Sequence, residues 1–185
     1  MIYDFPLRAV GLTVGIALLA THGAALMRPD WTKEWLKRLP RSRPLGILLC
    51  TLSAIWAFWL AATMDLGEFS PNRTLICGVI IAGAVMVPLF AEEFLAVRSL
   101  GILALLAAEP LLGAAFLRPE QTRLLLVVLA YGWAVGGLLL VGAPYLLRDG
   151  IAWIVSRPLR FQLAAWSGVA YGAALVCVSL LFFAP

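Results

Sequence analysis

The chain has 185 residues, of which 63% are hydrophobic and only 13% carry a charge, and its net charge is +4. A soluble domain of this length is usually about half apolar and about a quarter charged. This composition excludes an ordinary soluble domain, and charges that cluster between long apolar runs predict a single membrane domain over residues 1–185. We therefore expect an all-α polytopic membrane protein.

Six apolar runs have about the 20 residues that a helix needs to cross the hydrocarbon layer. The first run is longer than the apolar core of a signal peptide and starts beside Asp4, so we interpret it as a retained helix. The boundary between the third and fourth runs is the least defined, because residues 91–98 suit either a helix end or a loop. In chain order the predicted transmembrane helices are Leu7–Met27, Leu45–Met64, Thr74–Ala91, Ser99–Leu117, Leu124–Leu146 and Phe161–Phe183.

The connection after the first helix predicts a short amphipathic helix at the membrane interface. Asp30 is a suitable N-cap, aromatic side chains recur at helical spacing, and Pro40 ends the turn. Basic side chains fall largely on the opposite side, where they suit the anionic headgroups of the lipid bilayer. A docking site for a protein partner is the alternative interpretation. The residues that we expect at the interface and the headgroups are Trp31, Lys33, Trp35, Lys37 and Arg38.

Lysine and arginine counts predict the orientation of the helices. The first, third and fifth connections hold ten of these residues, whereas the opposite side holds four. By the positive-inside rule, both termini are expected on the non-cytoplasmic side, and we expect a bacterial inner (cytoplasmic) membrane. Binding to nucleic acid is not expected, because no basic surface lies away from the membrane edge.

Glu109 is the only charged residue in the fourth predicted helix and lies near its middle. An ionised side chain at that depth costs on the order of 3 kcal/mol on insertion scales, so such residues are functional candidates. Hydrocarbon favours the neutral carboxyl group, and no lysine or arginine lies at the same depth in another predicted helix. The hydroxyl groups of Ser53, Tyr131 and Tyr171 are near the middle of other helices and are the candidate partners.

Pro110 follows the acid directly and removes the backbone donor that would bond the carbonyl of Leu106. We therefore predict a helix kink at Pro110. A bent helix beside an intramembrane acid is typical of proteins that move ions or protons. The alternative is a protonated glutamate that shares a hydrogen bond between helices and fixes only their register.

Three pairs of glycines are spaced four residues apart in predicted helices: Gly11 and Gly15, Gly132 and Gly136, and Gly168 and Gly172. This spacing predicts close approach of helix backbones, either within one chain or between copies. A homo-oligomer is therefore among our expectations.

A weak internal similarity links two connections. Residues 26–30 and 43–45 resemble residues 146–149 and 157–159, with an arginine after the first helix and Arg-Pro-Leu before the second. We attribute the similarity to the general need for charges and helix breakers at a membrane surface. The alternative is a set of helical hairpins with one ancestry.

Glu92, Glu93 and Arg98 are expected as interfacial charges at the end of a hairpin, where they are also candidate docking residues. His22 is the only histidine and the cysteines are isolated, so we expect no metal and no cofactor. No recognised nucleophile motif is present, and we do not expect an enzyme.

Two functional hypotheses follow. The first is a small transporter- or channel-like protein in which Glu109 binds a proton or a cation. The second is a non-catalytic membrane subunit that anchors or assembles a larger membrane complex.

Overall fold

The computed structural model describes residues 3–90 and 93–183, and these residues form helices and connections without any β-strand. Six helices are long and apolar enough to cross a membrane, which confirms the predicted all-α polytopic fold. They are α1 (Leu7–Met27), α3 (Arg43–Thr63), α4 (Arg73–Phe90), α5 (Leu95–Ala115), α6 (Leu124–Gly142) and α8 (Pro158–Leu181). Shorter elements lie between them: α2 (Pro29–Arg38), α7 (Tyr145–Val155) and the 3-10 turns η1 (Leu39–Arg41), η2 (Gly67–Asn72) and η3 (Gln121–Arg123).

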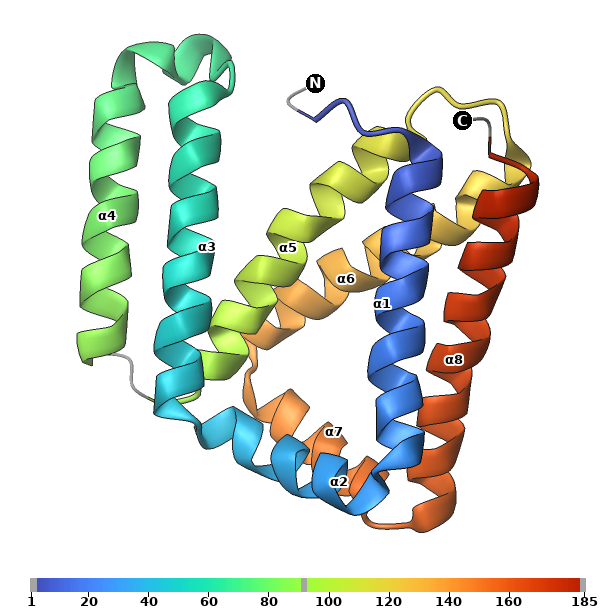
Figure 1. The fold of residues 1–185 in the computed structure, drawn as a ribbon. Helices are drawn as coiled ribbons and strands as arrows, with labels where there is room; N and C mark the ends of the chain where they lie inside the picture. The colour runs from blue at the N-terminus through green and yellow to red at the C-terminus, as the bar shows by residue number, and fades with distance from the viewer. Residues whose placement is uncertain (1–2, 91–92, 184–185) are drawn as a thin grey trace.

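The spanning helices form three antiparallel pairs (Figure 1). Helix α1 packs along α8, and α5 packs along α6, with α5 and α6 inclined steeply to α1. Helices α3 and α4 form a hairpin in which α3 also packs on α5. Both chain ends lie at one side of the bundle, and α2 and α7 lie at the opposite side. We call these the terminus side and the α2/α7 side.

Glycines explain the close contact between α1 and α8. A Cβ atom added to Gly15 would lie 3.0 Å from the carbonyl oxygen of Gly172, and one added to Gly172 would lie 2.9 Å from that of Gly15. Any larger side chain would push the backbones apart. A Cβ at Gly168 would overlap the ring of His22, and one at Gly11 would overlap the hydroxyl of Ser179. Two of the three predicted glycine patterns are thus confirmed as contacts within one chain.

The contact between α5 and α6 depends on a glycine pair that the spacing rule did not predict. A Cβ atom at Gly101 would lie 2.8 Å from the carbonyl oxygen of Gly137, and one at Gly137 would lie 2.7 Å from that of Gly101. The predicted pair on this helix, Gly132 and Gly136, has open space in place of a Cβ. Any close approach at these two glycines must therefore come from outside this chain.

Buried side chains concentrate where α1, α5, α6 and α8 meet. Leu126 and Leu175 are fully enclosed there, together with small residues such as Ala130. In contrast, α4 has no buried residue and packs mainly on α3. This buried cluster is thus made by four of the six spanning helices, and α3 adds buried residues where it packs on α5.

The start of α5 differs from the prediction, because the helix begins at Leu95 rather than Ser99. Phe94 has a left-handed backbone (φ 58°), and its carbonyl accepts the amide of Arg98 at 3.1 Å, so the helix follows it directly. Leu95, Ala96 and Val97 are buried, and the first two lie against Gly46 of α3. Because this first turn is buried against α3, the helix starts before Arg98 and is not limited to the uncharged run that begins at Ser99.

Two arginines bond the ends of preceding helices on the terminus side. Arg73 donates to the backbone carbonyls of Ala62 and Met64, the latter at 2.7 Å, at the end of α3. Arg123 donates to the carbonyl of Ala115 at 2.8 Å, at the end of α5. The last carbonyls of a helix have no partner within the helix, so these side chains stabilise the connections.

Candidate functional site

Glu109 lies on α5 six residues before the helix ends at Ala115, which places it about 9 Å from that end along the axis. The helix begins and ends earlier than predicted, so Glu109 is displaced from the middle of the helix toward the terminus side. It is exposed on the surface of the bundle, on the same face as Ile102 and Phe116. In a membrane this face meets lipid or another chain rather than the core.

The structure does not bring the three predicted hydroxyl partners to Glu109. Ser53 donates to the carbonyl of Leu49 at 2.8 Å and lies 3.3 Å from that of Ser99, so it links α3 to α5. Tyr171 donates to the carbonyl of Leu125 at 2.6 Å and links α8 to α6. Both hydroxyl groups therefore serve helix packing.

Tyr131 differs from the other two hydroxyl candidates. It is 59% exposed on the surface of α6, so its phenol group is accessible from outside the bundle. Within residues 3–90 and 93–183, neither Tyr131 nor Glu109 forms a hydrogen bond or an ion pair. Of the four predicted site residues, these two are exposed and have no hydrogen-bond partner among the described residues.

Pro110 does not interrupt α5, which continues as one α-helix to Ala115. The proline is buried, and so are Ala108 and Leu111, whereas Glu109 is exposed. Pro110 therefore faces the packed interior while the neighbouring acid faces outward.

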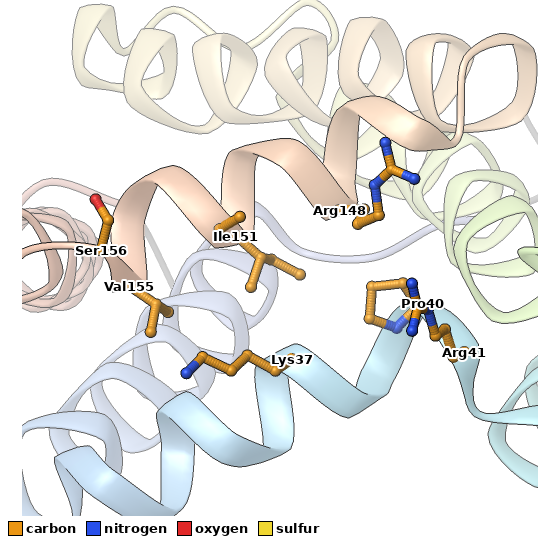
Figure 2. A pocket seen from close by; sticks show the side chains of 8 residues that line it. Lys37, Pro40, Arg41, Arg148, Ile151, Val155 and Ser156 are labelled. Atoms are coloured by element: carbon orange, nitrogen blue, oxygen red, sulfur yellow. The ribbon is translucent and has the colours of Figure 1, made fainter.

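Two amphipathic helices cover the α2/α7 side of the bundle. The short helix predicted after the first span is present as α2, which begins at Pro29 with Arg28 rather than Asp30 as its N-cap. Helix α7 lies beside it with the opposite chain direction (Figure 2). Trp31 and Trp35 are exposed on α2, as expected for residues at a membrane interface. Of the basic residues on α2, Lys37 and Arg38 are exposed, and Arg38 pairs with Glu34 at 3.4 Å.

Lys33 does not point toward the lipid headgroups, where the sequence predicts it. Its ammonium nitrogen lies 5.2 Å from the centroid of the Phe161 ring on α8 and 3.6 Å from a carboxylate oxygen of Asp30. Lys33 is thus directed toward the bundle, where it helps to hold α2 against α8. Only part of the predicted basic surface is available to headgroups.

Arg148 on α7 is a further cation on this side. Its Nε donates to Asp149 at 2.8 Å, and its guanidinium group lies 5.9 Å from the centroid of the Phe94 ring. The hydrogen bond with Asp149 and the negative charge of that carboxylate raise the pKa of Arg148 above its ordinary value. The side chain therefore stays cationic at any physiological pH.

The predicted docking residues lie on the same side of the bundle. Glu93 is exposed and lines a hollow with Arg41 and Arg148, and Arg98 is exposed near the start of α5. Glu92 falls outside the described residues. The structure therefore places Glu93 beside Arg41 and Arg148, which lie about 50 residues before it and about 50 residues after it in the sequence.

No cluster of three or more histidine, cysteine, aspartate or glutamate side chains that could hold a metal ion is found within residues 3–90 and 93–183. His22 packs against Gly168, and its Nδ1 lies 3.0 Å from the carbonyl of Leu18. These contacts give the histidine a packing role between α1 and α8.

Comparison with known proteins gives no relative: no family model, no curated protein and no solved structure matches this chain.

Helix α7 is not predicted by the sequence. Arg148, Ile151 and Ser156 fall in the predicted connection after the fifth span, because Tyr145 and Leu146 at the start of α7 continue the apolar run of that span. The helical spacing of Leu147, Ile151 and Ile154 was the signal available, since these residues are buried or half-buried, whereas Arg148 and Trp153 are exposed.

Proposed function

We propose that this chain is a small homo-oligomeric membrane protein of the transporter or channel type, in which Glu109 and Tyr131 of a neighbouring copy form a proton- or cation-binding site. One observation carries the proposal: both polar side chains are exposed on spanning helices, and neither has a polar partner among the described residues of its own chain.

The depths of the two side chains support this pairing. Glu109 precedes the end of α5 by six residues, and Tyr131 follows the start of α6 at Leu124 by seven. Both helix ends are on the terminus side, so the two groups are about 9 Å and about 10 Å from it along their helices. Copies inserted with the same orientation would therefore present Glu109 and Tyr131 at matching depth.

The chemistry of the pair suits proton or cation exchange. A phenol hydroxyl can donate to a carboxylate and can also accept from a protonated carboxyl group, so the pair accommodates both states of Glu109. An unpaired carboxylate in hydrocarbon costs on the order of 3 kcal/mol, whereas a hydrogen bond between membrane helices contributes about 1 kcal/mol. Pairing across an interface thus reduces this cost without removing the tendency to bind a proton.

Glycines on α6 support a close approach by a second copy. Gly132 and Gly136 have open space at their Cβ positions; Gly132 follows Tyr131 directly, and Gly136 lies about one helical turn further along α6. A helix from another copy could approach the backbone of α6 at this point.

The first test is a cysteine cross-link between copies. In a background with the three native cysteines replaced, Glu109→Cys and Tyr131→Cys on separately tagged chains should form a mixed disulfide in native membranes. Val79→Cys with Tyr131→Cys is the matched control, because Val79 is 63% exposed on α4 and lies outside the proposed contact between copies. Equal cross-linking of both pairs would contradict the interface.

The second test is flux in proteoliposomes. Glu109→Gln should abolish proton or cation flux while the protein stays folded and oligomeric, and Glu68→Gln in the exposed η2 turn should retain flux. A purified wild-type protein that carries no flux would refute the transport function, even if the cross-link forms.

The alternative function is a non-catalytic membrane subunit, and α4 favours it. This helix has no buried residue and presents a long apolar surface that includes Leu75, Val79 and Phe90. A different membrane protein that covers this surface would be recovered in stoichiometric amount in mild detergent. Purification of only this chain would favour the homo-oligomer.

A further inference from the structure

A cleft of about 350 Å³ lies between the two amphipathic helices on the α2/α7 side (Figure 2). Its wall on α2 and η1 carries Lys37, Pro40 and Arg41, and its wall on α7 carries Arg148, Ile151 and Val155. Three cations from three separate elements therefore line one hollow. The two helices that form it meet only in the folded protein.

The cations in the cleft outnumber the nearby acids. Within the described residues, Lys37 and Arg41 have no carboxylate partner, and Arg148 uses only its Nε to bind Asp149. Glu93 lies beside Arg41 and Arg148 in the adjoining hollow of about 430 Å³. Besides these three cations, Arg160 donates to Ser156 at 3.1 Å at the far end of the cleft.

The floor of the cleft is apolar. Pro40 and Ile151 are buried, and Val155 is half-buried beside them. A free phosphate ion gains nothing from such a floor, whereas an amphiphile can place its anionic group on the cations and its chains on the apolar residues. Amphipathic helices of this kind lie at the level of the lipid headgroups, which provides the ligand at high local concentration.

We infer that this cleft binds the headgroup of an anionic phospholipid, with Arg41 and Arg148 as ligands of its phosphate at one end and Lys37 as a further cation toward the other end (Figure 2). Arginine binds phosphate oxygens through parallel N–H groups, and lysine adds a mobile point charge. This site is separate from Glu109 and does not depend on the function proposed there. It also differs from diffuse attraction of a basic surface, because it requires both α2 and α7.

The test is lipid binding by the purified full chain, measured by native mass spectrometry in a non-ionic detergent. The triple variant Lys37→Gln, Arg41→Gln, Arg148→Gln should bind phosphatidylglycerol at least about tenfold more weakly than the wild type. The matched control removes the same charge from exposed residues on the same side of the bundle: Arg28→Gln, Arg38→Gln, Arg157→Gln. We expect the control to bind as the wild type does, within about twofold.

A second variant tests the cleft without altering its charge. Ala152→Trp places a large side chain in the exposed wall of the cleft and should also weaken phosphatidylglycerol binding by about tenfold or more. Helical content from circular dichroism and a single peak in gel filtration check that each variant is folded. If the triple variant does not fold, Ala152→Trp decides the result.

Three outcomes would overturn the inference. Equal weakening by the control triple variant would mean that binding reflects surface charge alone. Equal binding of phosphatidylcholine would show that the anionic headgroup is not recognised. Displacement of phosphatidylglycerol by millimolar inorganic phosphate would assign the cleft to free phosphate rather than to a lipid.

Discussion

Two regions of this bundle are built differently, although their helices have similar length and hydropathy. In the α1/α8 and α5/α6 pairs, glycines face each other so closely that an added Cβ atom would lie 3.0 Å or less from the opposite backbone. In the α3/α4 hairpin, the glycines of α4 at positions 78 and 83 have open space around them. None of the residues of α4 is buried.

The difference shows what determines helix association in lipid. Apolar side chains gain little by leaving lipid for protein, because both surroundings are apolar. Close backbone packing and interhelical hydrogen bonds therefore determine which helices form a core. Helix α4 is as apolar as its neighbours but has no small-residue contact of this kind, so it stays at the periphery.

The largest expected effect comes from Gly137→Leu, which should prevent α5 and α6 from packing. The nearest obstacle is the backbone oxygen of Gly101, which cannot rotate away, and we expect a loss of about 3 kcal/mol or more. Thermal unfolding in detergent measures it. Gly23→Leu on α1, where an added Cβ atom meets open space, is the control and should unfold at nearly the wild-type temperature. Similar losses in both variants would contradict the role assigned to this contact.

A smaller effect is expected when a core side chain is shortened. Leu126→Ala should cost about 2 kcal/mol, at the low end of the range for a buried leucine, because in a membrane mainly packing is lost. Leu75→Ala on α4 is the control, since Leu75 is 67% exposed and should cost less than about 0.5 kcal/mol. Reversal of this order in thermal unfolding would mean that α4 belongs to the stabilising core.

The smallest expected effect is local and concerns the weakly packed hairpin. Arg73→Gln removes the two backbone hydrogen bonds that close the connection between α3 and α4, so it should destabilise this connection by about 1–2 kcal/mol. Hydrogen exchange should then accelerate in residues 62–73 and remain unchanged in α6. Arg118→Gln serves as control, because Arg118 is exposed and has no hydrogen bond among the described residues. Uniform acceleration along the chain would contradict a local role.

The glycine patterns show which close helix contacts can be predicted from the sequence. The spacing rule correctly selected the glycines of α1 and α8 as places of close approach. On α6 it selected Gly132 and Gly136, whereas the contact within the chain uses Gly137 and Gly101. A small residue permits a close approach, but the rotation of the helix against its neighbour determines which small residue is used.

The internal similarity between the two Arg-Pro-Leu connections has a structural counterpart. Each connection contains an amphipathic helix, α2 in one and α7 in the other, and each enters the next spanning helix through a proline in its first turn. The first two residues of α7, Tyr145 and Leu146, continue the preceding apolar run in the sequence, so that the second helix was not predicted. The similarity between the two connections indicated a second amphipathic helix, which the apolar pattern alone did not.

Composition and periodicity alone determined that the chain has six helices long and apolar enough to cross a membrane, where most of them lie, and that a short amphipathic helix follows the first of them. These features follow from local hydrophobicity and the fixed rise of a helix. Only the tertiary structure decided that Glu109 faces outward, that Ser53 and Tyr171 serve packing, and that Lys37, Arg41 and Arg148 share one cleft. These relations depend on how each helix is rotated and tilted against its neighbours. The rotation and tilt depend on contacts between residues far apart in the chain, and a local sequence pattern contains no information about such contacts.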